Sequence, residues 1–526
     1  MYSDKENVNS LTAQLINANI RDIVVCPGSR NAVLVHNFYE AAISDSTLRL
    51  HPVTDERSAA FYAIGIWLAT RNPVAVCVTS GTALLNTLPA VAEAYYRQIP
   101  LVIISADRPP QWINQLDGQT LPQYDALYPY ANCIQMSESP STVTVPVYNP
   151  LMPLHINVPI SEPLFNFVTP RLTQPEYSYF EQWPLYDNGI QELDTIVGLI
   201  NNSRLPAVII GQYEGLPIEK LLKLDEENKL LLLPEIISNH PHARRTTWIE
   251  NIKAENLVLP DLVIHIGGAL VNKWLKIRLR EQEELKVIRV DKTDNCPDTF
   301  SHLEMKVKYD ESCFFETVAP HLKPNGNIQA FKDAVSGDFQ LSTIKEIAIQ
   351  TVWQHIIKSF RSDVPPVLFL GNSSTVRAAT HVVESGLIPI YCNRGVNGIE
   401  GSLSVAAGYS IVYPGDVYVI LGDLSFFYDV NALWNTQLGG NLHIVILNDH
   451  CGGIFSHLPG LKDTPALDKY IAAKHQCNAE GIAQSYHCEY IKVHNDSQLA
   501  MALCKNNDTT TNKPTIIEYD TDLEQD

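Results

Sequence analysis

Two aspartates directly follow apolar runs in the last third of the sequence, a position that suits metal chemistry. Asp423 comes after VYVIL in the segment GDLS (422–425), and Asp449 comes after LHIVIL in the segment NDHCGG (448–453). Because parallel strands end at one edge of a sheet, the two carboxylates can converge on a hard divalent cation, completed by backbone carbonyls and phosphate oxygens. Gly-rich backbone and a helix N-terminus beside them would hold a diphosphate. The alternative is that each aspartate caps the helix that follows it.

Glu56, near the N-terminus, also lies where an acid can have a structural or a functional role. Glu56 lies in TDER (54–57), between the strand-like run LRLHPV and the apolar helical run SAAFYAIGIWLAT. We expect Asp55 to cap that helix and Glu56 to lie in its first turn, where the helix dipole favours an acid. On local chemistry alone, no further role is needed for either residue.

Four arginines lie just past apolar runs or in the turns that follow them. They are Arg30 in PGSRN, Arg108 in ADRP, Arg377 after GNSS and Arg394 in NRG. The planar guanidinium suits bidentate contact with carboxylates. One arginine at such a turn is an ordinary solvated charge, whereas four of them in an acidic protein indicate anionic ligands.

The overall composition bounds the class of protein. The 526 residues include 38 Lys and Arg against 58 Asp and Glu, which gives a formal net charge of −20. The 45% of apolar and 18% of charged residues exclude a disordered chain. The acidic balance argues against a nucleic-acid partner and against a basic membrane-surface protein, since both need a basic face. Single cores stop growing at roughly 250–300 residues, so two or three domains are expected.

Cysteine usage and the first residues favour the cytoplasm. The ten cysteines are scattered without a C-x-x-C pair, and several lie in apolar runs such as VAVCVTS, which argues against a disulfide framework or a zinc site. The start MYSDKENVNS is polar and unlike a secretory signal. No apolar run approaches the ~18 residues of a membrane helix. We therefore expect a soluble cytoplasmic protein.

Short β-branched runs alternate with helical stretches along the whole sequence. The runs are continuously apolar, which is typical of parallel strands covered by helices on both faces. They fall into three sets, separated by Pro-rich and polar stretches near 169–190 and 323–345. The sequence therefore predicts an α/β fold of three domains, each with a mainly parallel sheet flanked by helices, at 1–180, 190–340 and 346–526.

The spacing of GDLS and NDHCGG resembles the GDG…NN signature of thiamine-diphosphate-dependent enzymes. The resemblance implies that Asp423, Asp449 and the Cys451 carbonyl bind the Mg²⁺ or Mn²⁺ that carries the diphosphate of thiamine diphosphate. It makes residues 346–526 the diphosphate-binding domain and residues 1–180 the pyrimidine-binding domain. Asp449 stands where the family usually has Asn, and Leu424 replaces the final Gly of the signature.

The same resemblance gives Glu56 a catalytic role. In these enzymes a glutamate of the pyrimidine-binding domain hydrogen-bonds the aminopyrimidine ring of the cofactor and promotes its active form. These enzymes place the cofactor between the N-terminal domain of one subunit and the C-terminal domain of another. The resemblance therefore implies a homodimer or homotetramer with shared active sites.

An ordered set of motifs narrows the resemblance to the family of 2-succinyl-5-enolpyruvyl-6-hydroxy-3-cyclohexene-1-carboxylate synthases. The set spans nearly the whole chain, strongly in the outer domains and thinly in the central one. It comprises PGSRN (27–31), DERSA (55–59), TSGTA (79–83), ADRP (106–109), GNS (371–373), NRG (393–395), GIEG (398–401) and IFSHLP (454–459). The family joins 2-oxoglutarate to isochorismate with loss of carbon dioxide, in menaquinone biosynthesis.

The family resemblance assigns roles to further residues. Both substrates are dicarboxylates, and the positions that match substrate contacts are Ser29, Arg30, Arg108, Gln119, Lys273, Ser373, Arg377 and Arg394. The positions that match cofactor contacts are Glu56, Gly422, Asp423, Ser425, Ile399, Asn448, Ile454 and Phe455. Ile399 would support the bent cofactor, and Ile454, Phe455 and Leu458 would line its pocket, although a plain core role suits these last three equally.

Lys273 is the weakest of these assignments. It is followed by Trp274 where the family typically has Arg, so Lys276 or Arg278 would have to compensate, unless Trp274 simply packs. An exposed helix lysine remains the alternative for Lys273.

Two other functions stay open at this point. One is another thiamine-dependent 2-oxoacid decarboxylase or carboligase, of the acetolactate-synthase type, against which the strand-end arginines argue. The other is a catalytically silent regulator that binds thiamine or a nucleotide on the same fold, against which Glu56 and Asp423 argue.

Overall fold

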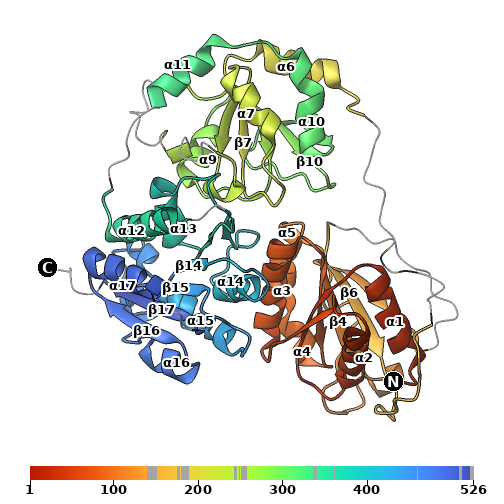
Figure 1. Cartoon of the computed structure of the whole chain (residues 1–526). Coiled ribbons are helices and arrows are strands. Elements are labelled where there is room, and N and C mark those ends of the chain that lie inside the picture. The colour runs from red at the N-terminus through yellow and green to blue at the C-terminus, as the bar shows by residue number, and fades with distance from the viewer. Residues whose placement is uncertain are drawn as a thin grey trace.

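The computed structural model shows three parallel sheets, each flanked by helices (Figure 1). The central sheet lies above the other two in this view, with the N-terminal sheet below it on the right and the C-terminal sheet on the left. The structure describes residues 1–138, 151–173, 178, 180, 189–241, 246–247, 249, 258–335, 341–360, 363–458, 460–508 and 512–521. Much of the linker predicted near 169–190, residues 336–340 of the one predicted near 323–345, and Pro459 of the IFSHLP motif lie outside these residues. The second linker prediction is wrong over 326–335, which form a helix whose Ile328, Phe331 and Val335 are buried in the central core.

The N-terminal sheet has six strands in the order β2-β1-β3-β4-β6-β5, and every neighbouring pair is parallel. Its strands are β1 (Asp22–Val25), β2 (Arg49–Pro52), β3 (Val74–Val78), β4 (Leu101–Asp107), β5 (Asn132–Gln135) and β6 (Leu154–Pro159). Its helices are α1 (Glu6–Asn17), α2 (Ala32–Ser44), α3 (Glu56–Thr70), α4 (Thr82–Asn86), α5 (Leu88–Tyr96) and the 3₁₀ turn η1 (Pro110–Trp112).

The central sheet has five parallel strands in the order β11-β10-β9-β7-β8. They are β7 (Pro206–Ile210), β8 (Leu231–Pro234), β9 (Leu262–Ile266), β10 (Lys286–Asp291) and β11 (Leu303–Lys308). The helical elements around it are α6 (Leu193–Asn202), α7 (Glu219–Glu226), η2 (Ile236–Ser238), α9 (Lys273–Arg280), α10 (Glu311–Val318), η4 (Ala319–His321) and α11 (Gly326–Val335).

The C-terminal sheet repeats the plan of the first, with six parallel strands in the order β13-β12-β14-β15-β17-β16. They are β12 (Val367–Leu370), β13 (Ile390–Cys392), β14 (Val417–Gly422), β15 (Leu442–Asn448), β16 (Glu489–Val493) and β17 (Thr515–Asp520). The helices are α12 (Ile344–Ser359), α13 (Ser374–Val382), α14 (Ser402–Ser410), α15 (Asp423–Tyr428), α16 (Glu480–Ser485) and α17 (Asp496–Asp508), with the short turns η5 (Val430–Leu433), η6 (Gly453–His457) and η7 (Leu467–Ile471).

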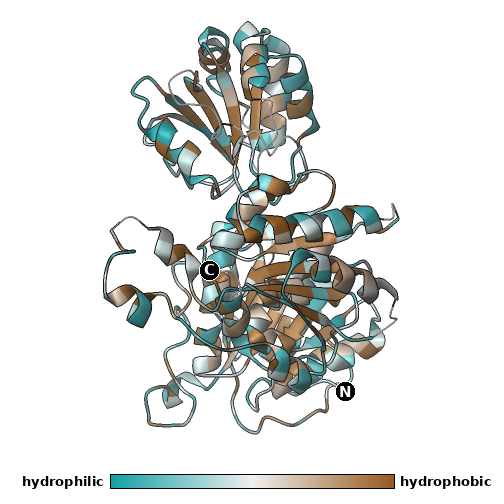
Figure 2. Ribbon diagram, turned by 90° about the vertical axis from the view of Figure 1, so that its left-hand side faces the viewer, coloured by the Kyte–Doolittle hydropathy of each residue, from teal (hydrophilic) through white to brown (hydrophobic). Residues whose placement is uncertain are grey.

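Apolar strands form the cores, and one core is shared by the two outer domains. Figure 2 shows the strands largely brown and many loops teal. A single cluster of buried apolar residues joins α3 of the N-terminal domain to α14 of the C-terminal domain. A Cβ on Gly65 would lie 2.0 Å from the Val405 carbonyl oxygen, and one on Gly408 would lie 2.3 Å from that of Tyr62. The two glycines therefore let the helices touch backbone to backbone, which fixes the outer domains to each other.

The predicted architecture of three domains with parallel sheets is confirmed, and the local differences have simple causes. The sequence suggests one helix over 82–98, but the chain breaks at Thr87, where Pro89 enters the first turn of the next helix and its missing N–H ends the ladder. Strands β5, β6, β11 and β16 are not predicted, because their apolar runs are short or interrupted by polar residues.

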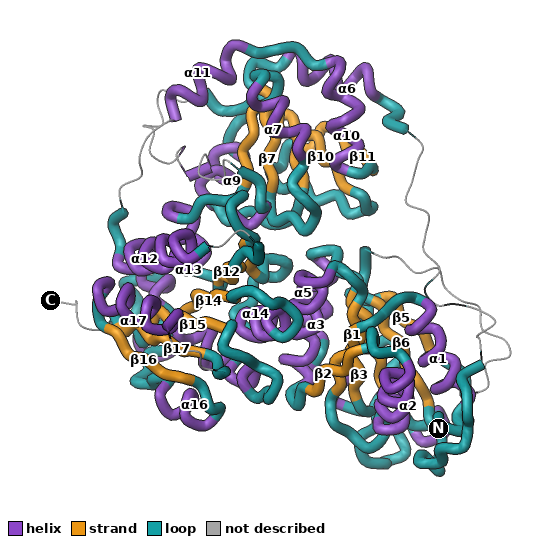
Figure 3. Tube along the Cα trace, in the orientation of Figure 1, coloured by secondary structure: helices purple, strands orange, loops and turns teal. Residues whose placement is uncertain are grey.

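Two crevices follow from the strand orders. In the N-terminal sheet the order turns between β1 and β3, and in the C-terminal sheet it turns between β12 and β14. At such a point the connections leave in opposite directions and open a space beyond the carboxyl ends of the strands, where α/β folds bind ligands. Figure 3 traces the loops that leave these strand ends. Among the described residues, no helix is long and apolar enough to cross a membrane.

Candidate active site

The two aspartates of the GDLS and NDHCGG segments lie side by side. Strands β14 and β15 are neighbours, with Gly422 opposite Leu447, so Asp423 and Asp449 leave adjacent strand ends. Asp423 is 2% exposed and Asp449 is half-buried. Burial and then the negative charge of Asp449 raise the pKa of the Asp423 carboxyl. A divalent cation between the two carboxylates would relieve that repulsion.

Each of these carboxylates has one basic partner from a distant part of the chain. His475 Nε2 lies 3.0 Å from Asp423 Oδ2, and Lys345 Nζ donates a hydrogen bond of 2.5 Å to Asp449 Oδ2. Neither partner was predicted, because no spacing in the sequence connects them with the aspartates. Lys345 supplies a positive charge that offsets the negative charge of Asp449, which stands where the GDG…NN signature has Asn.

The third predicted ligand, Cys451, lies beside both aspartates. Burial and then the charges of Asp449 and Asp423 raise the pKa of its thiol. A Cβ on Gly453 would lie 2.4 Å from Asp449 Oδ2, so a larger residue here would displace the Asp449 carboxylate. Among the described residues, no three His, Cys, Asp or Glu side chains are grouped to hold a metal ion. The predicted set contains only two such side chains, with the Cys451 carbonyl as third donor, and its hard oxygens fit Mg²⁺.

The residues around this pair differ in what they offer a ligand. No atom lies within 4 Å of a Cβ built on Gly422, so there is open space beside Asp423, whereas Ser425 is buried on α15. Asn448 is fully buried, and its side chain forms hydrogen bonds within the protein. Its Nδ2 donates to Glu518 Oε1 at 2.6 Å, and its Oδ1 accepts the N–H of His450 at 3.0 Å. In this structure Asn448 thus shapes the turn that presents Asp449.

Glu56 is the first residue of α3, as expected. Asp55 caps the helix, since its Oδ1 accepts the N–H of Arg57 at 2.8 Å and that of Ser58 at 3.3 Å. The Glu56 carboxylate is half-buried, and its Oε2 lies 3.5 Å from Asn86 Nδ2. Glu56 therefore keeps most of its hydrogen-bonding capacity for a ligand.

The start of α3 is tied to the C-terminal domain. Asn431 Nδ2 donates to Asp55 Oδ2 at 2.7 Å, and the Arg57 guanidinium donates to the Tyr428 carbonyl at 2.6 Å. In the described part of the chain, however, no hydrogen bond or ion pair joins Glu56 to Asp423 or Asp449. Since all three residues are carboxylates, no such link is expected between them, and the contacts of Asp55 and Arg57 hold the first turn of α3 against the C-terminal domain.

Two predicted substrate arginines lie at the carboxyl edge of the N-terminal sheet. Arg30 is buried and donates to the Ile160 carbonyl at 3.0 Å, with Glu162 Oε1 at 3.1 Å. Arg108 is half-buried and donates to the Gly118 carbonyl at 3.3 Å. Ser29 is exposed in the turn of Arg30, and Gln119 is exposed with φ 57°.

The other two arginines lie together at the edge of the C-terminal sheet. Arg394 is 7% exposed, its Nη2 donates to the Leu270 carbonyl at 3.1 Å, and its Nε is buried without a partner. Partial burial and then the charge of Arg394 lower the pKa of Arg377, whose side chain reaches the surface. Ser373 is the N-cap residue of α13, the helix that carries Arg377, and its φ is 74°.

The central domain adds cations to this group. Burial and then the charges of Arg280, Arg394 and Lys273 lower the pKa of Lys276. Lys273 itself is exposed at the start of α9. Trp274 packs on the central core, with the Arg278 guanidinium 5.7 Å from its ring centre, so Trp274 has a packing role and Lys276 is the neighbour of Arg394. Neighbouring positive charges that lower the pKa of Lys276 and of Arg377 indicate a site for an anion.

The apolar positions are available to a ligand. Ile399, Ile454 and Phe455 are half-buried, and Leu458 is 38% exposed. None of the four belongs to the core clusters found among the described residues. A pure core role is therefore excluded for them.

Comparisons with known proteins agree with this geometry. Residues 7–126 match the model of the thiamine pyrophosphate enzyme N-terminal TPP binding domain, and residues 352–519 match that of the C-terminal TPP binding domain. Thiamine pyrophosphate is another name for thiamine diphosphate. A protein from Mycobacterium smegmatis described as thiamin diphosphate-dependent has the same fold, with a TM-score of 0.70 and 14% identity over 98% of this chain and 99% of its own. The protein is therefore a thiamine-diphosphate-dependent enzyme.

Relatives place it within that class. A 2-succinyl-5-enolpyruvyl-6-hydroxy-3-cyclohexene-1-carboxylate synthase of Phocaeicola vulgatus is 36% identical over 100% of this chain and 97% of its own. Synthases of the same name from Bacteroides thetaiotaomicron and Flavobacterium johnsoniae are 36% and 32% identical, over 96% and 91% of this chain and 93% and 90% of their own. The chain belongs to this synthase family.

Proposed function

We propose that the protein decarboxylates 2-oxoglutarate and adds the resulting succinyl unit to isochorismate. The product is 2-succinyl-5-enolpyruvyl-6-hydroxy-3-cyclohexene-1-carboxylate, an intermediate of menaquinone biosynthesis. The observation that carries the proposal is the grouping of Arg377, Arg394 and Lys276 in a chain with a net charge of −20. Both substrates are dicarboxylates, and such a group provides the local positive charge that the acidic surface lacks.

Bound thiamine diphosphate supplies an electron sink for the decarboxylation. We propose that Asp423, Asp449 and the Cys451 carbonyl bind Mg²⁺ or Mn²⁺ for its diphosphate, with Gly422 and Ser425 alongside. The support is chemical: the negative charge of Asp449 helps to raise the pKa of the adjacent Asp423 carboxyl, and open space lies beside Gly422. Ile399, Ile454 and Phe455 are half-buried rather than in a core, which suits contact with an apolar ring.

Glu56 has the role of a proton-transferring carboxyl in this proposal. Within the described part of the chain its oxygens have one weak partner, Asn86, so one of them can share a proton with a ring nitrogen of the aminopyrimidine. Asp55 fixes the helix turn from which Glu56 projects. The arginines then bind and orient the substrate carboxylates, which lowers the entropic barrier to joining them.

The proposed enzyme works as a homodimer or homotetramer in which Glu56 of one subunit faces the metal site of another. The support is that large apolar side chains are exposed on the single chain, among them Leu116, Tyr428 and Trp434. Mixing inactive Glu56→Gln and Asp423→Ala subunits should restore part of the activity if the sites are shared. Complete absence of restored activity in verified mixed dimers would contradict sharing.

We also propose the domain limits 1–180, 190–340 and 346–526, and a cytoplasmic location. The decisive experiment incubates the protein with thiamine diphosphate, Mg²⁺, 2-oxoglutarate and isochorismate, and follows the loss of isochorismate absorbance. Omitting each component in turn is the control. Turnover without isochorismate would favour another 2-oxoacid decarboxylase or carboligase, and absence of carbon dioxide release would favour a silent binding protein.

A further inference from the structure

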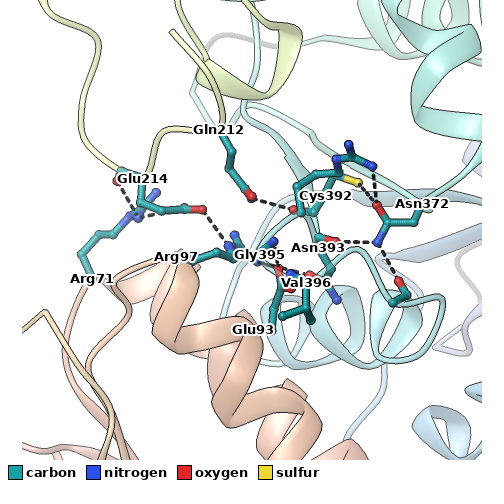
Figure 4. A network of polar contacts seen from close by, with 12 residues as sticks. Arg71, Glu93, Arg97, Gln212, Glu214, Asn372, Cys392, Asn393, Gly395 and Val396 are labelled. Carbon is teal, nitrogen blue, oxygen red and sulfur yellow. Dashed lines mark hydrogen bonds and ion pairs between the residues drawn. The ribbon is translucent and has the colours of Figure 1, made fainter. Parts of the chain in front are cut away.

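The turn that carries Arg394 is held by a glutamate of another domain. Residues 393–396 follow β13, and Glu93 lies in the last turn of α5. The Glu93 side chain is 1% exposed, and its two oxygens accept the N–H groups of consecutive residues, Gly395 at 2.9 Å and Val396 at 2.8 Å (Figure 4). A side chain of the N-terminal domain thus binds the backbone immediately after Arg394 through two hydrogen bonds.

The fit between α5 and this turn is close. A Cβ on Gly395 would lie 2.7 Å from the backbone oxygen of Glu93 and 2.9 Å from its Oε2, so only glycine allows the approach. One helical turn further, the Arg97 guanidinium donates to Asn393 Oδ1 at 3.2 Å and to Glu214 Oε1 at 2.8 Å. Both ends of the turn are therefore bound to the same helix, as Figure 4 shows.

Few other contacts fix the Arg394 side chain. Its Nη2 donates to the Leu270 carbonyl at 3.1 Å, its Nη1 lies 3.4 Å from Asn372 Oδ1, and its Nε has no hydrogen-bond partner among the residues that the structure describes. The direction of the guanidinium therefore depends on the backbone from which it projects. A carboxylate that receives two charge-assisted hydrogen bonds from that backbone is a strong constraint on it.

We propose that Glu93 is a positioning residue for Arg394: it holds the 393–396 turn so that the guanidinium meets a substrate carboxylate. This inference rests on the proposed function only in assigning a dicarboxylate to Arg394. The competing explanation is that Glu93 merely joins two domains. A joining role would affect folding stability, whereas a positioning role acts through Arg394 and shows in substrate handling.

The test is a double-mutant cycle on the full-length enzyme with saturating thiamine diphosphate and Mg²⁺. Glu93→Gln should raise the KM of at least one dicarboxylate on the order of tenfold, and Arg394→Ala should raise the KM of the same substrate. The double variant should be no worse than Arg394→Ala alone, because Glu93 acts through that residue. An unchanged KM in Glu93→Gln, or losses that simply multiply in the double variant, would overturn the inference.

The chain offers a matched control and a second variant. Asp261 also accepts consecutive N–H groups, from Arg204 at 2.9 Å and Leu205 at 2.8 Å, at a place in the central domain that holds no predicted site residue. Asp261→Asn should lower the melting temperature and leave both KM values unchanged. If Glu93→Gln does not fold, Gly395→Ala displaces the same turn with Glu93 intact and should raise the same KM. Failure of the wild-type enzyme to form product would instead refute the proposed function.

Discussion

Asp423 and Glu93 are both buried carboxylates, yet their surroundings are opposite. Burial raises the pKa of each, but the next largest influence on Glu93 is the favourable charge of Arg97, whereas for Asp423 it is the repulsive charge of Asp449. Two backbone N–H groups complete the shell of Glu93. Glu93 thus faces an opposite charge, whereas Asp423, although His475 and the Leu424 N–H contact its two oxygens, faces the like charge of Asp449. The difference teaches that a buried acid with fulfilled hydrogen bonds organises structure, whereas one facing a like charge is suited to binding a cation.

Glu56, like Asp423, is an acid suited to binding a ligand, and changing it should have the largest effect on turnover. Glu56→Gln keeps the size of the side chain but cannot transfer a proton, so kcat should fall by about 10²–10⁴-fold. Thiamine diphosphate affinity, measured by titration of intrinsic fluorescence, should stay near that of the wild type. Near-normal turnover in this variant would remove Glu56 from the chemistry.

Asp423→Ala should have the next largest effect, and it separates the two kinds of acid directly. Loss of a metal-binding carboxylate should weaken Mg²⁺-dependent binding of thiamine diphosphate by about 100-fold, since such losses are typically 10–100-fold or more. Calorimetric titration with and without Mg²⁺ measures this. Asp429→Asn is the matched control: Asp429 is also a buried carboxylate, but it is satisfied by the Ser404 N–H and hydroxyl at 2.8 Å each. Equal losses of Mg²⁺-dependent thiamine diphosphate affinity in Asp423→Ala and Asp429→Asn would contradict the distinction between the two kinds of acid.

The pairing of Lys345 with Asp449 sharpens the comparison through charge. Asp449→Asn leaves Lys345 as an uncompensated positive charge beside the metal site, so Mg²⁺ affinity should fall by about tenfold, equivalent to about 1.4 kcal/mol. Adding Lys345→Met removes that charge and should recover most of the affinity. A double variant that binds Mg²⁺ no better than Asp449→Asn would show that Lys345 does not balance Asp449.

The smallest expected effect is on stability, through Asp429. Burial raises the pKa of its carboxyl to about 6, above its ordinary value of 3.8. A carboxyl whose pKa is raised by folding binds protons more tightly in the folded state, so its contribution is present at low pH and is lost as pH rises through about 6. The free energy of unfolding should therefore lose about 1 kcal/mol from this group between pH 5 and pH 7. Asp429→Asn should flatten that part of the pH profile in denaturant titrations, and an unaltered slope would refute the assignment.

Much of the fold is predictable from local patterns. The continuously apolar runs identify most strands, and their turns identify Asp423, Asp449 and Arg394 as strand-end residues. Asp55 is predicted as a helix cap and is observed as one. These features are accessible because each depends on a few neighbouring residues.

Other features depend on separations that sequence spacing does not encode. Lys345 meets Asp449 across 104 positions, and Glu93 meets Gly395 across 302. The sequence does not say whether Trp274 packs on the core or whether another residue replaces the missing arginine. The structure shows both, because Trp274 packs on the central core and Lys276 lies near Arg394.

The sequence by itself determined the class of chemistry. Strand-end acids and arginines predict a divalent cation, a diphosphate and anionic substrates from residue types and short spacings, whereas the thiamine cofactor and the role of Glu56 follow from the resemblance of the motifs to a known family. Only the tertiary structure decided which charges are satisfied. Glu93, Asp423 and Asp429 are all acids in apolar surroundings, and they differ solely in the partners that distant elements bring to them. Burial makes every missing partner costly, so those long-range contacts separate the acids that organise the fold from those suited to bind a ligand.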